Sequence, residues 1–268
     1  MSKENNSEMP FLDHLEELRW HIMRSFLAIV IIAILAFIFK TFLFDVIILG
    51  PSKPEFFTNR ALCWIGEVLN KPAFCINKTP LNLQNINMAG QFSTTIMIAM
   101  ITGLVVAFPY IFWEFWRFIR PALYPNEIKH SRGAIFFASS LFTVGILFAY
   151  YIICPLSIEF LANFKVSQSV DNIINLNSYI STIASVVLAC GIMFELPMLI
   201  YFLSKVGIIS SGFLKKYRRH AIVLSLSVSA IITPPDVLSM ILVFLPILAL
   251  YEAGIVIAKG IEKKNSKS

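Results

Sequence analysis

Charged residues are scarce in this chain. Asp, Glu, Lys and Arg make up 14% of its 268 residues, whereas apolar residues make up 57%. A soluble globular domain carries roughly 25% charged residues, so this composition excludes an ordinary soluble protein. Apolar stretches at residues 22–44, 92–116, 134–154 and 179–203 are each long enough to cross a bilayer, which takes about 20 helical residues. We predict an all-α, polytopic membrane protein.

Recognisable catalytic patterns are also missing. The chain has no HExxH, GxSxG or Walker A motif, and no paired set of cysteine and histidine ligands. An intramembrane enzyme would need a nucleophile and a base, or metal ligands, at matching depths, and no such set is evident. We therefore expect no enzymatic activity, no catalytic residue, no bound metal and no cofactor.

The basic residues do not require a nucleic-acid partner, although the formal net charge is +6. If the amino terminus is cytoplasmic and each apolar stretch crosses once, 16 of the 22 basic residues lie on the cytoplasmic side. Membrane proteins show this bias because cytoplasmic loops are enriched in Lys and Arg. The pattern predicts a multi-pass membrane protein with both termini in the cytoplasm.

A fifth apolar region spans residues 220–258 and is interrupted by TPPD at residues 233–236. Its 39 residues are too few for two full spans and a turn, because each span takes about 20 residues. We predict six membrane helices with the last two short; a re-entrant hairpin fits the same charges.

The rest of the chain fits a single membrane domain over residues 1–268. Residues 1–21 form the predicted cytoplasmic lead-in. The amphipathic pattern PFLDHLEELRWHIMR at residues 10–24 predicts a helix that lies at the membrane surface and runs into the first span. Residues 45–91 form a long outer loop, for which we expect an ordered cap with short helices. Residues 259–268 are lysine-rich and predict a flexible cytoplasmic tail.

Only four cysteines are present, and two of them, Cys63 and Cys75, fall in the outer loop. In an oxidising compartment these two are candidates for a disulfide bond, and the alternative is two unpaired thiols. A bond would close a 13-residue loop and stabilise it by about 3 kcal/mol on the chain-entropy model.

A minority of acidic residues lies near the predicted cytoplasmic surface. Glu16, Glu17, Glu114 and Glu127 fall at the interface, whereas Glu195 and Glu252 lie deeper. A carboxylate in a partly dehydrated groove pairs well with arginine, so this set suits a basic peptide. The alternative is that Glu17 pairs with Arg19, Arg24 or Arg132 and only ties the fold together.

Several motifs resemble the TatC family, the multispanning core subunit of the twin-arginine protein translocase. They occur in order along almost the whole chain as HLEELR at 14–19, FPYIFWEFWRFIRPALYPNE at 108–127, FELP at 194–197, ITPPDVLSM at 232–240 and LYEAG at 250–254. One departure is Trp113, where a tyrosine is expected.

The resemblance implies six membrane helices in a concave, glove-like arrangement, in the cytoplasmic (inner) membrane of a bacterium. It also implies a receptor that binds twin-arginine signal peptides of folded cargo proteins and transports the cargo with the proton-motive force. The implied partners are small single-span subunits of TatA/TatB type, the lipid bilayer and further copies of the chain in a homo-oligomer.

The resemblance also implies roles for individual residues. Glu17 and Glu127 fall on the family's contacts to the arginines of the signal. Other signal-recognition positions are Arg19, Phe118, Pro121 and Leu123. Structural positions are Pro51, Pro234, Pro235 and Asp236.

Glu195 lies inside an otherwise apolar span, close to its midplane. A charged side chain costs about 2.5–3.5 kcal/mol or more at such a depth, so we expect it to face protein or water. Three roles remain open: a proton relay, a buried polar pair, and a polar lining that meets a partner. The alternative function is a proton- or ion-coupled small-molecule transporter that uses Glu195, and a third possibility is a passive scaffold.

Overall fold

The computed structural model describes residues 11–78, 81–119, 131–167, 169, 172–233 and 237–265. Five helical segments of this described chain are long and apolar enough to cross a bilayer: Leu15–Ile38, Gly90–Ile119, Gly133–Asn163, Leu176–Lys205 and Ser239–Lys263. Each contains, or largely overlaps, an apolar stretch that the sequence assigns to a span. The prediction of a polytopic helical membrane protein is confirmed.

The two helices of the last apolar region differ in length. Helix α11 (Arg218–Ile232) has 15 residues and rises only about 22 Å, as the sequence predicts for a short helix. Helix α12 (Val237–Asn265) has 29 residues and is not short. It continues through residues 259–265, which the sequence assigned to a flexible tail. The turn residues Pro234, Pro235 and Asp236 lie outside the described residues.

Internal contacts divide the chain, which the sequence treats as one membrane domain, into two compact units. Unit 1 comprises residues 1–39 and 96–139, and unit 2 comprises residues 40–95 and 140–268.

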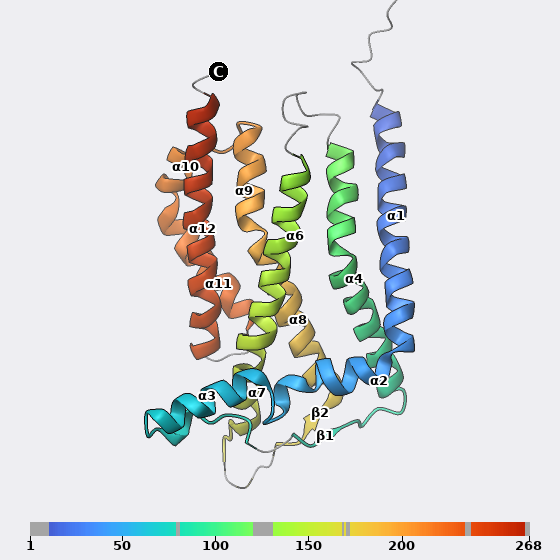
Figure 1. Cartoon of the computed structure of the whole chain (residues 1–268), viewed down its shortest axis with the longest axis vertical. Helices are drawn as coiled ribbons and strands as arrows, with labels where there is room; N and C mark the ends of the chain where they lie inside the picture. Colours follow the sequence, from blue (N-terminus) through green and yellow to red (C-terminus); the bar gives the residue numbers. More distant parts are fainter. Residues whose placement is uncertain are drawn as a thin grey trace, which may run out of the picture. The chain divides into compact units, whose positions relative to one another are not determined.

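Unit 1 is built on helix α1 (Phe11–Ile38) and most of helix α4 (Gly90–Ile119), which run in opposite directions (Figure 1). The lead-in predicted at the membrane surface and the first span therefore form one helix over the described residues. The two helices approach closely at Gly103, where an added Cβ would lie 2.6 Å from the carbonyl oxygen of Ile29. Helix α4 continues through Pro109 without ending.

The third span enters unit 2 as helix α6 (Ser131–Phe148), a π-helical turn at Ala149–Ile153 and helix α7 (Cys154–Asn163). Gly145 brings α6 against the next span, because an added Cβ would lie 2.8 Å from both the carbonyl oxygen of Cys190 and the Cβ of Phe194.

The fourth span is interrupted at Glu195. Helix α8 (Leu176–Phe194) ends there and helix α9 (Leu196–Lys205) begins on the next residue. Pro197 explains the break, because proline has no N–H to donate to the carbonyl of Met193. The N–H of Glu195 instead donates to the carbonyl of Ile192 at 3.1 Å.

Helix α12 packs on α9, and the two remaining helices pack on α12. Helix α10 (Ser211–Lys216), α11 and α12 contribute to a core that contains Ile200, Leu214, Tyr251, Ile255 and Ala258. Glu262 of α12 accepts hydrogen bonds from Ser211, at 2.6 Å from the backbone nitrogen and 2.5 Å from the hydroxyl. These contacts hold the end of α12 that the sequence assigned to a flexible tail.

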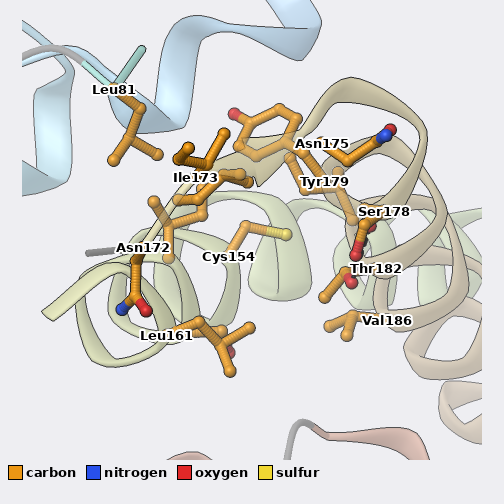
Figure 2. A pocket seen from close by; sticks show the side chains of 14 residues that line it. Leu81, Cys154, Leu161, Asn172, Ile173, Asn175, Ser178, Tyr179, Thr182 and Val186 are labelled. Carbon is orange, nitrogen blue, oxygen red and sulfur yellow. Dashed lines mark hydrogen bonds between the residues drawn. The ribbon is translucent and has the colours of Figure 1, made fainter. Parts of the chain in front are cut away.

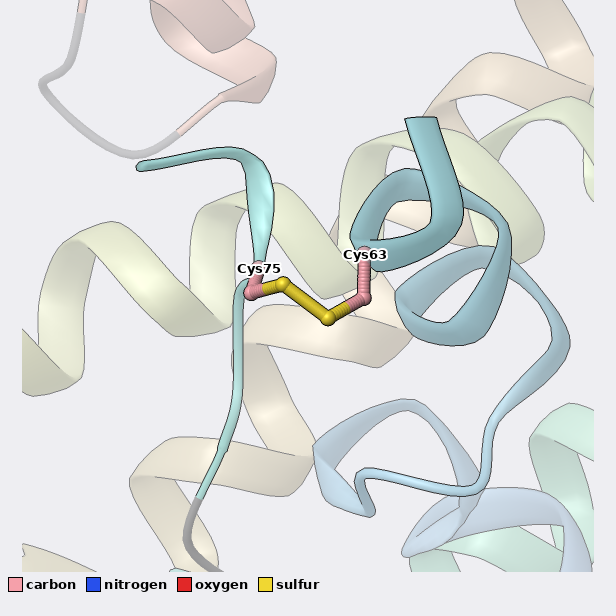
Figure 3. The surroundings of a disulfide bond; sticks show 2 residues. All are labelled: Cys63 and Cys75. Atoms are coloured by element: carbon pink, nitrogen blue, oxygen red, sulfur yellow. A yellow bond between two sulfur atoms is a disulfide. The ribbon is translucent and has the colours of Figure 1, made fainter. Parts of the chain in front are cut away.

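The first loop contains short helices, as expected for an ordered cap. They are α2 (Lys40–Phe42), a π-helical segment at Leu43–Ile48, 3-10 turns at Gly50–Ser52 and Pro72–Phe74, and helix α3 (Phe57–Val68). Strand β1 (Leu83–Gln84) pairs in parallel with strand β2 (Ile174–Asn175). Cys63 of α3 and Cys75 are joined by a disulfide bond (Figure 3).

Pro51 anchors this loop. It is fully buried, and its carbonyl accepts hydrogen bonds from the side-chain amides of Asn59 at 3.1 Å and Asn77 at 3.4 Å. Both asparagines are buried themselves. The network satisfies buried polar groups that would otherwise cost free energy, and it supports the structural role implied for Pro51.

Candidate functional site

A buried carboxylate, Glu114, lies near the end of α4 in unit 1. Its side chain is 1% exposed and is hydrogen-bonded to Nδ1 of His21 on α1. Its other oxygen lies 3.3 Å from a guanidinium nitrogen of Arg117, one turn further along α4. Tyr110 also hydrogen-bonds to this carboxylate. Buried charges are tolerated where they are paired in this way, so the cluster ties α1 to α4.

His21 connects this cluster to two residues that the sequence singles out. Its Nε2 lies 3.9 Å from a carboxylate oxygen of Glu17, one turn earlier on α1. Its ring also meets the ring of Phe118 edge to face, with centroids 6.2 Å apart. Glu17 and Phe118, which are 101 positions apart in the sequence, are therefore both neighbours of one imidazole.

The two glutamates of this cluster differ in access. The side chain of Glu17 is 37% exposed, whereas that of Glu114 is 1% exposed and already paired. A positively charged group arriving from water therefore reaches Glu17 first. Ion pairing between carboxylate and guanidinium is the chemistry that this cluster offers.

The other signal-recognition candidates divide between described and undescribed residues. Arg19 is exposed on α1. Pro121, Leu123 and Glu127 lie in residues 120–130, outside the described chain. Among the described side chains, the ion-pair neighbour of Glu17 is His21 rather than Arg19 or Arg24.

The sequence predicts Glu114 near the cytoplasmic surface but does not pair it with His21. A usable signal exists, because both are ionisable residues within one or two turns of the end of a membrane helix. Such residues usually pair with one another. Sequence alone does not show that these two helix ends lie together.

Glu195 occupies a different environment in unit 2. Both of its carboxylate oxygens are buried, and neither has a hydrogen-bond partner of normal geometry among the described residues, although the backbone of Phe142 lies nearby. The buried polar pair that the sequence left open is therefore not seen in the described chain. The position combines a helix break with a carboxylate that has no well-formed hydrogen bond among the described residues.

A cavity of about 580 Å³ opens beside α7 and the start of α8 (Figure 2). Cys154, Leu161 and Val186 form apolar walls, and Asn172 and Thr182 add polar groups. Its lining contains no charged side chain, so the cavity does not suit a basic peptide. No group of three or more metal-ligating side chains occurs among the residues that the structure describes.

Comparison with known proteins places the chain in a family. The model of the family described as Sec-independent protein translocase protein (TatC) matches residues 13–246. The TatC protein of Blattabacterium sp. subsp. Periplaneta americana is 41% identical over 264 residues, which cover 98% of this chain and 99% of that protein. The TatC protein of Desulforapulum autotrophicum is 32% identical, and the alignment covers 98% of this chain and 89% of that protein.

Two crystal structures of the twin arginine translocase receptor TatC are also similar. One has a TM-score of 0.69 and 30% identity, covering 93% of this chain and 99% of that chain. The other, in DDM, has a TM-score of 0.71 and 31% identity, covering 91% of this chain and 98% of that chain. Family model, relatives and fold agree over almost the whole length, and the chain belongs to the TatC family of Sec-independent protein translocase proteins.

Proposed function

We propose that this translocase protein is the receptor that binds twin-arginine signal peptides, with Glu17 and Glu127 as the carboxylates that hold the two arginines. The observation that carries the proposal is the half-exposed carboxylate of Glu17, held beside His21 and Phe118 at one end of unit 1. The segment that contains Glu127 follows directly from α4, the helix that carries Phe118. The related crystal structures are of twin arginine translocase receptors.

The chemistry favours arginine over lysine. A guanidinium presents several N–H donors in a plane and binds a carboxylate through two parallel hydrogen bonds, whereas an ammonium acts as a point charge. A hydrogen bond to a charged group contributes about 1.5–3 kcal/mol. Two such carboxylates therefore suffice to discriminate an arginine pair from a lysine pair.

The other residues of the site have supporting roles in this proposal. Phe118 offers an apolar ring beside His21, and Arg19 is exposed on the same helix as Glu17. Pro121 and Leu123 shape the segment that presents Glu127. The apolar part of the signal then follows the spans into the membrane.

The topology is part of the same proposal. Both termini face the cytoplasm of a bacterial cell, so Glu17 meets cargo before export. The chain assembles with small single-span TatA/TatB-type subunits and with further copies of itself, and the proton-motive force drives transport. Glu195, whose carboxylate is not satisfied within the described chain, meets a polar group of a partner helix or of water. The alternative function, a small-molecule transporter that uses Glu195, gains no support from the family, because its members are described as protein translocases.

The test is retention of a signal peptide by the purified chain in detergent. A photo-crosslinkable peptide with the RR pair is expected to label the chain, and its KK version to label it several-fold less. Glu17→Ala and Glu127→Ala are each expected to abolish labelling.

Glu16→Ala is the matched control, because Glu16 is an exposed carboxylate on the neighbouring position of α1. It is expected to label as the unaltered chain does. Equal labelling by the RR and KK peptides, or full labelling of both Glu17→Ala and Glu127→Ala, would overturn the assignment.

A further inference from the structure

Helix α3 in the first loop carries a large apolar surface that unit 2 does not cover. Phe57, Trp64, Val68 and the following Leu69 are between 55% and 74% exposed. With 3.6 residues per turn, positions 57, 61, 64 and 68 fall within an arc of about 60°. The large side chains therefore form one continuous stripe, and Ile65 and Leu69 widen it on one side.

The opposite side of α3 is packed. Asn59 is buried and hydrogen-bonded to the carbonyls of Pro51 and Lys53. Cys63 forms the disulfide bond to Cys75. Gly66 is buried, and an added Cβ would lie 2.9 Å from the carbonyl oxygen of Lys71. These contacts fix the rotation of the helix, so the apolar stripe is held outward and cannot turn into the unit.

Contacts with the third span set the depth of α3. The hydroxyl of Thr58 donates to the carbonyl of Tyr151, and the rings of Phe57 and Tyr151 meet edge to face at 6.3 Å. Tyr150 is in the same belt, with its hydroxyl donating to the carbonyl of Ile47 at 2.7 Å. Tyrosine and tryptophan are enriched at the membrane–water interface.

The order of apolar and polar residues along the third span also places α3 near the membrane–water interface. Its apolar run ends near Cys154, and Glu159 follows in α7, where it accepts a hydrogen bond from the backbone of Asn77 at 2.6 Å. Tyr150 and Tyr151 therefore lie within about two turns of the polar boundary. Helix α3 starts near this boundary. It runs crosswise to the direction of α9 and α12 in the same unit (Figure 1).

The charges of α3 border the stripe on one flank. Arg60 and Glu67 are both exposed and fall on one flank of the helix. Thr58, which contacts the span, falls instead on the flank that bears Ile65 and Leu69. Ile65 and Leu69 thus share the side of the span, and the charged residues lie on the other flank of the stripe. This is the arrangement of a helix that lies in a membrane interface.

We propose that α3 is an interfacial helix whose apolar stripe inserts among the lipids of the leaflet at this end of the spans. The occupant is lipid because the stripe continues, through the contact of Phe57 with Tyr151, the half-exposed aromatic surface of a membrane span. The disulfide bond and the asparagine network hold the helix in that orientation. Neither the twin-arginine assignment nor Glu17 enters this inference.

The test measures lipid contact at Trp64 in nanodiscs that hold a single chain. In a variant with Trp20, Trp113 and Trp116 replaced by Phe, Trp64 is expected to be quenched strongly by brominated acyl chains and weakly by aqueous iodide. The matched control adds Trp64→Phe and Glu67→Trp, which places the indole on the charged flank. There we expect the reverse pattern, with several-fold weaker quenching by brominated lipid.

Two results would overturn the proposal. Iodide quenching of Trp64 as strong as that of the Glu67→Trp control would place the stripe in water. Protection from both quenchers in larger discs with several chains, but not in single-chain discs, would make it an interface between copies.

Because Trp116 is buried, the triple replacement can impair folding. The unaltered chain is therefore also exposed to phospholipids with a photoreactive group in the acyl chain, in proteoliposomes. Adducts are expected on the peptide that contains Trp64 and Val68, and their absence there, with adducts on α12 as a positive control, would refute lipid insertion.

Discussion

Two glutamates of the apolar spans have buried carboxylate oxygens, and their surroundings differ. Glu114 in unit 1 is hydrogen-bonded to His21 and lies 3.3 Å from Arg117. Glu195 in unit 2 has two buried carboxylate oxygens without a hydrogen-bond partner of normal geometry among the described residues. A buried carboxylate stabilises a fold only where the protein supplies partners for it.

The two residues therefore differ in what their carboxylates do within the fold. Glu114 joins two helices that the chain must bring together, and its loss leaves His21 and Arg117 without their common partner. Glu195 lies where α8 ends and α9 begins, and its carboxylate oxygens have no hydrogen-bond partner of normal geometry among the described residues. Our proposal that Glu195 meets a polar group of a partner helix or of water rests on this missing partner.

The largest expected effect is on Glu114→Ala. The substitution leaves the buried imidazole of His21 without its acceptor and opens a cavity, so we expect a loss of about 1–3 kcal/mol in the free energy of unfolding. The thermal unfolding midpoint in detergent, followed by intrinsic fluorescence, measures it. Glu114→Gln keeps an acceptor and is expected to lose less; an unchanged midpoint for Glu114→Ala would remove the distinction from Glu195.

The next largest loss of stability is expected at the contact between α1 and α4, the two helices that carry His21 and Glu114. In Gly103→Ala the new methyl group would meet the carbonyl oxygen of Ile29 at 2.6 Å, and a backbone atom cannot move aside cheaply. Overpacking of this kind costs about 1–3 kcal/mol. The same unfolding measurement applies. Gly133→Ala is the control, since an added Cβ there meets nothing within 4 Å, and an equal loss in both variants would contradict the prediction.

A smaller effect is expected for Arg117→Ala. The side chain of Arg117 is 43% exposed, and ion pairs with an exposed partner contribute about 0–1 kcal/mol. His21 remains as the partner of Glu114, so the midpoint should fall less than in Glu114→Ala. Raising the salt concentration should shrink the difference from the unaltered chain, and a loss as large as that of Glu114→Ala would make Arg117 the main partner.

The smallest loss of stability is expected for Glu195→Leu. Since the carboxylate has no hydrogen-bond partner of normal geometry in the described chain, an apolar replacement should leave the unfolding midpoint unchanged or raise it. Export of a twin-arginine cargo from cells that carry only this variant should nevertheless fail, and Glu195→Gln should retain more export than Glu195→Leu. A clear drop in the midpoint of Glu195→Leu would place Glu195 in the same class as Glu114.

Much of the helical layout is predictable from the sequence. The spans follow from apolar length, and the break at Glu195 follows from Pro197. The short α11 follows from the 13 residues between His220 and the TPPD turn. The length of α12 does not, because Glu262 and its contact with Ser211 extend the helix into a segment whose composition resembles a tail. Glu17 stands out by motif, whereas its neighbour His21 gains a role only from α4.

What the sequence by itself determined is where helices form, because the hydrogen bonds of a membrane helix are satisfied within the helix and its apolar length is a local property. What the tertiary structure decided is which polar residues meet. His21 and Glu114 are 93 positions apart, and each has several ionisable neighbours nearer in sequence. Only the packing of α1 on α4 at Gly103 joins them, and only the packing around α8 leaves Glu195 without a matching partner in the described chain. The spacing of residues within one helix does not show which face of another helix they contact.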